Sequence, residues 1–196
     1  ANFVGSMLIS NDAGTGTLNA ASNNTGFGHQ VFNVLTEGDG NTAIGADALS
    51  ALTTGDNNTG AGLDVLKANT TGTENVGVGY NALVANTTGD NNIGIGANAL
   101  LANTTAGNNV AVGYEALKTV TTGTANVAVG FQALKTSTAD NNTAVGNQAL
   151  ELCSTGGNNT AVGNNSLDAN TTGASNTAIG ALSLSGNTTA ANNVAV

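Results

Sequence analysis

The chain has little of what a water-soluble domain normally displays on its surface. Charged residues make up 8% of its 196 residues, and arginine, proline and tryptophan are absent. Globular domains carry about 25% charged residues, and α-helices use Leu, Glu, Lys and Arg on their faces, so a helical fold is disfavoured. Glycine (28 residues), Asn, Thr and Ala dominate instead, which favours β-branched strands joined by turns.

Positive charge is also scarce. Lys67, Lys118 and Lys135 are the only basic residues besides one histidine, and the net charge is −9. A phosphate backbone or an anionic membrane surface would repel such a chain, so we expect no nucleic-acid partner. No apolar run approaches the roughly 18 residues that span a bilayer, so we expect no membrane insertion.

A 17-residue unit repeats along most of the chain. Its glycine recurs every 17 residues, with one step of 16, at Gly28, Gly45, Gly62, Gly79, Gly96, Gly113, Gly130, Gly146, Gly163 and Gly180. A β-branched residue, a small Ala or Gly and another apolar residue usually precede this glycine, and Ala-Leu or a similar pair follows. A Thr-Thr-Gly turn then leads to the next unit. Seventeen residues are too few for a domain but suffice for one coil of a solenoid.

Each unit also has an asparagine four residues before its glycine. In a stack of coils these side chains would form a ladder of amide hydrogen bonds. The predicted structural ladder comprises Asn41, Asn58, Asn75, Asn92, Asn109, Asn126, Asn142, Asn159 and Asn176.

The repeat predicts an all-β fold, a parallel β-solenoid of 17-residue coils over residues 24–196. We expect two short strands per coil, one ending at the glycine and one beginning at Ala-Leu. The first strand has β-branched residues on one face and only Ala or Gly on the other. Because neither face is charged, we expect the Ala/Gly face to lie against a neighbouring chain in a side-by-side homotrimer, the alternative being a single flat coil with a bland outer face.

The units NTAIGADAL (41–49), NVAVGYEAL (109–117) and NTAVGNQAL (142–150) resemble the head repeats of trimeric autotransporter adhesins, and similar repeats occur in bacteriophage tail fibres. The resemblance covers about residues 24–196. It implies a left-handed β-roll with three chains side by side, in an extracellular fibre used for attachment on a bacterial cell surface or a virion. The longer Thr-Thr-Gly turn departs from that pattern, and residues 1–196 contain no segment that resembles that family's membrane anchor or coiled-coil stalk, which leaves bacterial versus viral origin open.

Residues 1–23 fit the repeat poorly. Asn2–Gly5 and Gly14–Gly16 look like degenerate units, and Phe3, Met7 and Leu8 are candidates to cap the stack, as solenoids require. The opposite end has no comparable cap, so we expect the natural protein to continue there.

Catalytic and metal-binding chemistry has few candidate residues. His29 and Cys153 are the only residues of their kinds, and neither has the companions of a triad or a zinc site. Cys153 shares its repeat position with Asn69, so we interpret it as variable turn filler. Glu37 and Asp39 are the only local acidic pair and lack a calcium-repeat pattern. We therefore expect no enzyme activity and no cofactor or bound metal.

Two surface features suggest binding. Tyr80, Tyr114 and Phe131 directly follow repeat glycines, and Lys118 and Lys135 lie four residues beyond two of them. Stacked coils would gather these residues into a stripe for a host-surface protein or glycan receptor. The paired threonines offer an alternative, an ice-binding ladder, although only one threonine of each pair can point outward.

Overall fold

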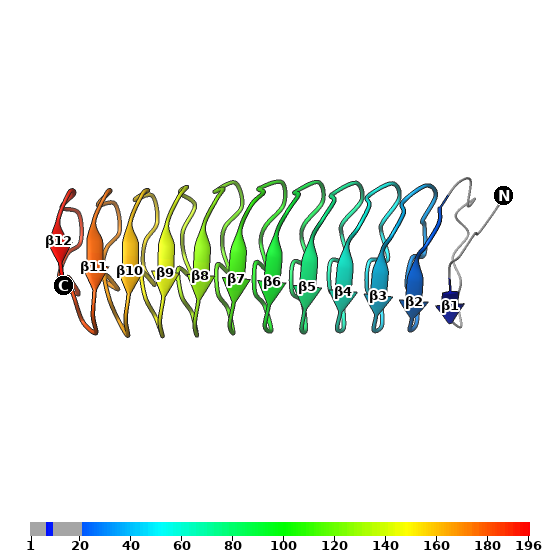
Figure 1. Cartoon of the computed structure of the whole chain (residues 1–196), viewed down its shortest axis with the longest axis horizontal. Helices are drawn as coiled ribbons and strands as arrows, with labels where there is room; N and C mark the ends of the chain where they lie inside the picture. Colours follow the sequence, from blue (N-terminus) through cyan, green and yellow to red (C-terminus); the bar gives the residue numbers. More distant parts are fainter. Residues whose placement is uncertain (1–6, 10–20) are drawn as a thin grey trace.

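The computed structural model describes residues 7–9 and 21–196, which form a straight rod of stacked coils (Figure 1). Each coil contributes one short strand, and within the described residues the strands follow one another in a single parallel sheet of order β1 to β12. The strands are β1 (Met7–Ile9), β2 (Thr25–Phe27), β3 (Thr42–Ile44), β4 (Thr59–Ala61), β5 (Val76–Val78), β6 (Ile93–Ile95), β7 (Val110–Val112), β8 (Val127–Val129), β9 (Thr143–Val145), β10 (Thr160–Val162), β11 (Thr177–Ile179) and β12 (Val194–Ala195). The predicted parallel β-solenoid is thereby confirmed.

The register of the sheet follows the repeat. Thr42 pairs with Thr59 and Ile44 with Ala61, so equivalent residues of neighbouring coils lie side by side. The 16-residue step keeps this register, since Val127 still pairs with Thr143. The shortened coil absorbs the missing residue in its turn, where the Ala139 N–H donates to Ser137 Oγ at 3.2 Å.

From β2 to β11 the middle residue of each strand points into the coil, which corrects our interpretation of the Ala/Gly face. Ala43, Ala111 and Ala161 are fully buried inside their own chain. Only a small residue fits there, because a Cβ added to Gly94 would lie 3.2 Å from Leu83 Cγ. The small residues make room for the leucine file, and no neighbouring chain is needed to cover them.

The predicted second strand is absent from the described coils. After the glycine the chain runs through a series of turns, in which alternate residues such as Asp47 (φ 56°) and Leu49 (φ 50°) have left-handed backbone conformations. The Asp47 N–H donates to His29 O of the preceding coil at 2.9 Å, and the Leu49 N–H donates to Val65 O of the following coil at 3.1 Å. The segment therefore bonds to both neighbours without forming a pleated strand.

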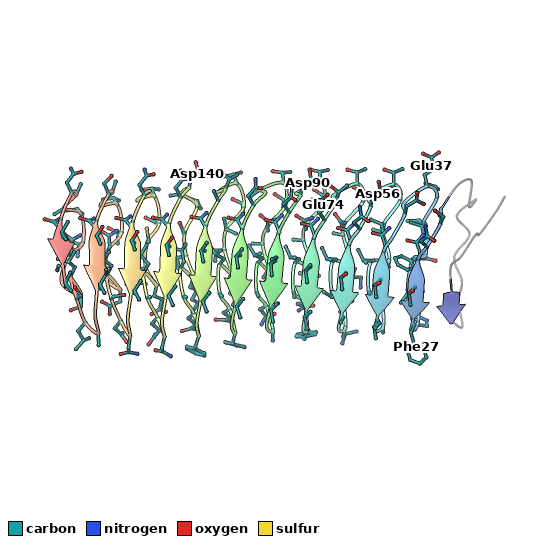
Figure 2. All side chains as sticks on the ribbon, viewed as in Figure 1. Phe27, Glu37, Asp56, Glu74, Asp90 and Asp140 are labelled. Atoms are coloured by element: carbon teal, nitrogen blue, oxygen red, sulfur yellow. The ribbon has the colours of Figure 1, made fainter. Side chains whose placement is uncertain are left out.

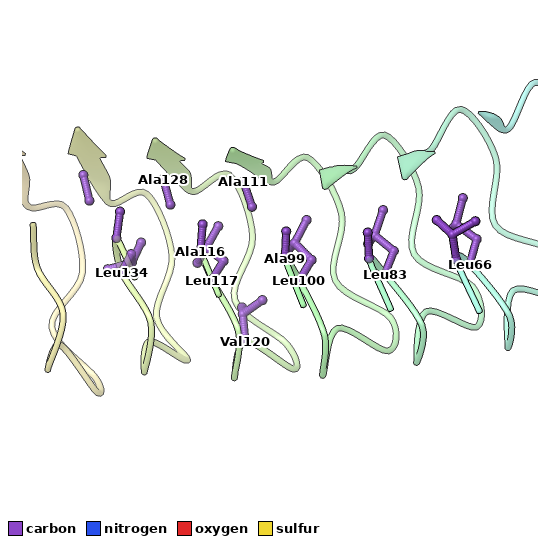
Figure 3. Close-up of a cluster of buried hydrophobic side chains, with 14 of the residues drawn as sticks. Leu66, Leu83, Ala99, Leu100, Ala111, Ala116, Leu117, Val120, Ala128 and Leu134 are labelled. Carbon is purple, nitrogen blue, oxygen red and sulfur yellow. The ribbon is translucent and has the colours of Figure 1, made fainter. Parts of the chain in front are cut away.

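The core is a column of leucines and small residues (Figure 3). Fully buried leucines recur once per coil, at Leu49, Leu66, Leu83, Leu100, Leu117, Leu134, Leu150 and Leu167. Burying each one contributes about 2 kcal/mol. Because every leucine packs beside its equivalents in the next coils, the column gains stability with each coil added.

Cys153 belongs to this core, so our interpretation of it as turn filler is wrong. Its repeat position is buried throughout the array, where it also holds Leu52, Asn69, Val120 and Ser137. Burial raises the pKa of the Cys153 thiol, and its Sγ lies 3.1 Å from Gly156 O. Asn69 likewise donates to Gly72 O at 3.0 Å, so this position tolerates any side chain of suitable size.

The ladder asparagines lie in one fully buried file. Asn41 Oδ1 accepts both the backbone N–H of Asn58 at 2.8 Å and its Nδ2 at 3.1 Å, while Asn58 Nδ2 also donates to Gly72 O at 2.8 Å. Each amide thus satisfies backbone groups of the turn in two coils. An apolar side chain cannot supply both bonds, which explains why this position does not vary.

The start of the chain is described only in part. β1 pairs in parallel with β2, with Leu8 beside Gly26. The predicted degenerate units around Asn2–Gly5 and Gly14–Gly16, and the predicted capping by Phe3, lie outside the described residues. Within the part that is described, no helical segment has the length and hydrophobicity needed to cross a membrane.

Candidate functional site

The two long edges of the rod differ in chemistry (Figure 2). One edge, which we name the acidic edge, carries Glu37, Asp56, Glu74, Asp90 and Asp140. Three of these carboxylates accept backbone N–H groups of the preceding coil, as Asp90 Oδ1 does from Thr73 at 2.7 Å. In the described residues no three His, Cys, Asp or Glu side chains are grouped to hold a metal ion. Asp56, Asp90 and Asp140 therefore have a structural use in the turns.

The sheet face is the outward side of the parallel sheet. From β2 to β11 the first and third residues of each strand point outward, and these are Thr, Val and Ile, apart from Phe27 and Ala61. Ile44 is 47% exposed and Ile95 38%. These two files contain no charged residue and run the length of the array, so they form a continuous apolar strip of the kind that marks an interaction surface.

The aromatic edge lies beside the sheet face. We define it as the residues that directly follow the repeat glycines from Gly62 to Gly163, namely Leu63, Tyr80, Ala97, Tyr114, Phe131, Asn147 and Asn164. Tyr80, Tyr114 and Phe131 are about half exposed. The rings of Tyr114 and Phe131 stack with centroids 5.5 Å apart and an interplanar angle of 12°. The sequence-predicted aromatics are thus on the surface, and two of them meet.

The two lysines predicted to accompany these rings contact carboxylates. Lys118 Nζ lies 2.7 Å from Glu115 Oε1, and Lys135 Nζ lies 3.4 Å from Glu115 Oε2 and 3.9 Å from Glu151 Oε1. Two lysines and two glutamates leave this cluster without net charge. The predicted stripe of aromatic and basic groups therefore contains exposed aromatic rings, but its lysines are paired with glutamates in a network without net charge.

Glu115 predicts a specific pH dependence of stability. Hydrogen bonds from Lys118 and Gln132, followed by the charge of Lys118 and a bond from Lys135, lower the pKa of Glu115 from 4.5 to about 2. A depressed carboxyl pKa stabilises the fold above the unfolded pKa and loses that effect as pH falls toward the folded value. Discounted for solvent, the ion pairs contribute about 1–2 kcal/mol at neutral pH. Denaturation midpoints should show Glu115→Gln less stable than wild type at pH 7 and equal to it near pH 2.

Glu74→Gln is the control for this titration, because Glu74 is exposed and forms no ion pair in the described chain. Its difference from wild type should stay small at both pH values. An unchanged Glu115→Gln difference between pH 7 and pH 2 would contradict the assigned ion pairs.

Comparisons with protein families, with curated proteins and with solved structures find no match to this chain.

The threonine pairs split into one structural file and one free file. The first hydroxyl of most pairs bonds to the backbone of the next coil, as Thr70 Oγ1 donates to Thr87 O at 3.1 Å and Thr87 Oγ1 to Thr104 O at 3.0 Å. The second threonine, such as Thr71 or Thr88, is exposed. A single outward file is thus available on this turn.

Sequence reasoning missed two amide side chains beside the aromatic edge. Asn81 and Asn98, which follow Tyr80 and Ala97, have no side-chain hydrogen bond within the described residues. In four other coils this position pairs with the residue three further on, as Asn165 does with Asp168 at 3.2 Å and Gln148 with Glu151 at 2.8 Å. In these two coils that residue is apolar, Val84 or Leu101. The apolar residues Val84 and Leu101 could be seen in the sequence. They indicate an amide without a partner only once the side-chain pairs of the other coils are known from the structure.

Proposed function

We propose that this chain is a structural and adhesive segment of an extracellular fibre, in which three parallel copies pack through their sheet faces. The observation that carries the proposal is the uncharged, β-branched strip that each coil repeats on the outside of the sheet. Exposure to water of an apolar strip as long as the rod is unfavourable, and packing against the identical strip of a neighbouring copy would bury it. The left-handed sense of the coil and the location on a bacterial cell surface or a virion rest on the resemblance to adhesin heads and tail fibres.

Solution mass tests the assembly. Light scattering on the native chain should give three times 18.9 kDa. Ile95→Lys should reduce the mass to that of the monomer, because a lysine in the centre of an apolar interface is buried in every copy. A monomeric wild type would overturn the trimer.

Thr88→Lys is the matched control, since Thr88 is exposed in the adjacent coil and lies in a turn outside the strands. It should leave the trimer intact. A trimer that survives Ile95→Lys would show that the sheet face is not the interface.

Ice binding is a second candidate, favoured by the free file of exposed threonines. Their hydroxyls have no partner within the described chain and recur at one coil spacing. One file on a turn offers less flat surface than the two files of the sheet face, so we rank ice binding second. Thermal hysteresis in freezing assays would support ice binding, and its absence would eliminate it.

A further inference from the structure

The aromatic edge has one missing ring. Along consecutive coils its residues are Tyr80, Ala97, Tyr114 and Phe131. Tyr114 and Phe131 already stack across one coil spacing, whereas Ala97 leaves the position between the two tyrosines without a ring. Parallel strands are about 4.8 Å apart, so the two tyrosine positions are about 10 Å apart. A flat group above Ala97 would lie about 5 Å from each ring, within the range for stacked rings.

Polar groups accompany this gap. Asn81 and Asn98, whose amides have no hydrogen-bond partner within the described chain, directly follow Tyr80 and Ala97, and both residues are half-buried. Neither tyrosine hydroxyl has a hydrogen-bond partner within the described chain. In the adjoining coils the equivalent polar side chains are engaged, as Gln132 Nε2 is with Glu115 Oε2 at 2.9 Å. Stacking faces and free hydrogen-bond groups therefore occur together only at this point of the edge.

We propose that Tyr80, Asn81, Ala97, Asn98 and Tyr114 form a binding site for one ring of a neutral oligosaccharide. The apolar C–H faces of a sugar ring would stack on the two tyrosines, and its hydroxyls would hydrogen-bond to the amides and phenols. This assignment rests on the proposed adhesive function, for which it names neutral oligosaccharides as the class of ligand.

The chemistry of the site favours a neutral sugar over other ligands. A purely aromatic group would fill the gap but leave the two amides unpaired, which costs binding energy. A phosphate or sulfate group would meet no free cation, because Lys118 and Lys135 are held by Glu115. A protein partner needs about 800 Å² of surface on each side, far more than five residues provide.

Tyrosine fluorescence reports directly on this site. The chain has no tryptophan, and Tyr80 and Tyr114 are its only tyrosines. Titration with a panel of neutral oligosaccharides built from glucose, galactose, mannose and N-acetylhexosamine units should give a saturable change for at least one. If no member of the panel changes the fluorescence, the site is overturned.

Ala97→Phe provides the sharpest test, because a phenylalanine there would complete the stack already made by Tyr114 and Phe131. The variant should keep its fold and weaken sugar binding at least tenfold. Ala181→Phe, at the same repeat position in another coil, should bind as wild type. Asn98→Gly should weaken binding several-fold, since glycine suits the positive φ of Asn98 (59°) and removes only the amide. Full binding by Ala97→Phe would place the sugar elsewhere and overturn the assignment.

The solution mass separates this site from the fibre proposal. A trimer that binds no sugar refutes the sugar site alone. If the wild type is a monomer that binds sugar, and the Ala97→Phe variant does not bind it, only the trimer is refuted. The double variant Tyr80→Ala/Tyr114→Ala should remain trimeric, and its sugar binding, measured by calorimetry, should be lost.

Discussion

Gly113→Ala should destabilise the fold by about 3–5 kcal/mol, the sum of backbone strain and a steric clash. Gly113 has φ of +137°, a conformation that alanine rarely adopts. Its new Cβ would also meet the carbonyl oxygen of Gly130 and lie 2.6 Å from the carbonyl carbon. That carbonyl belongs to the backbone of the next coil and cannot rotate away. Denaturant unfolding followed by far-ultraviolet circular dichroism measures the loss.

Gly180→Ala separates the two causes. Gly180 has a similar φ of +120°, but a Cβ there has no atom within 4 Å. This variant should show the backbone strain alone, about 1–2 kcal/mol. If both variants lost the same stability, the close contact between glycines of neighbouring coils would not be the reason that this position is always glycine.

Asn109→Ala should destabilise the fold by about 3–5 kcal/mol, because it leaves two buried backbone groups without partners. Asn109 Oδ1 accepts the Asn126 N–H at 3.0 Å, and Asn109 Nδ2 donates to Gly123 O at 2.9 Å. Within the described residues Gly123 O has no second donor, because the position that holds an amide in coils such as that of Asn86 is Val120 here. Unfolding by denaturant again measures the cost.

Asn75→Ala offers an internal comparison within the same ladder. Asn75 Nδ2 donates to Gly89 O at 2.8 Å, but that carbonyl also accepts Asn86 Nδ2 at 3.0 Å. Asn75→Ala should therefore cost about 1 kcal/mol less than Asn109→Ala. Asn147→Ala, at an exposed asparagine, should change stability by less than about 0.5 kcal/mol. Equal losses for Asn75 and Asn109 would contradict the assigned backbone partners.

The repeat alone was enough to predict a parallel stack, since a 17-residue period with fixed residue types allows little else. It did not show which side of the strand faces the core. The alternation of side chains along a strand shows which residues share a face. Which of the two faces points into the core depends on the residues that pack against it. Here the leucine of the return segment fills the interior, so Ala43 points inward and Ile44 outward.

The missing second strand has a different cause. Ala-Leu is compatible with an extended chain, and leucine seldom adopts a left-handed conformation. In the folded rod Leu49 does so within a segment that hydrogen-bonds to the preceding coil through Asp47 and to the following coil through Leu49 itself. The aromatic residues of the candidate site were visible in the repeat. The free amides were not, because Asn81 and Asn98 are distinctive only once their usual partners are known.

The constant register between coils has a consequence for how such a rod can vary. Each coil bonds only to the coils before and after it, and Thr42, Thr59 and their equivalents are interchangeable in the sheet. Insertion or removal of one whole unit would preserve every ladder, whereas a shift of a few residues inside a strand would break them all. Length can therefore change in discrete steps of about 4.8 Å. A gene built this way can adjust the reach of its product by duplication or loss of 17 codons.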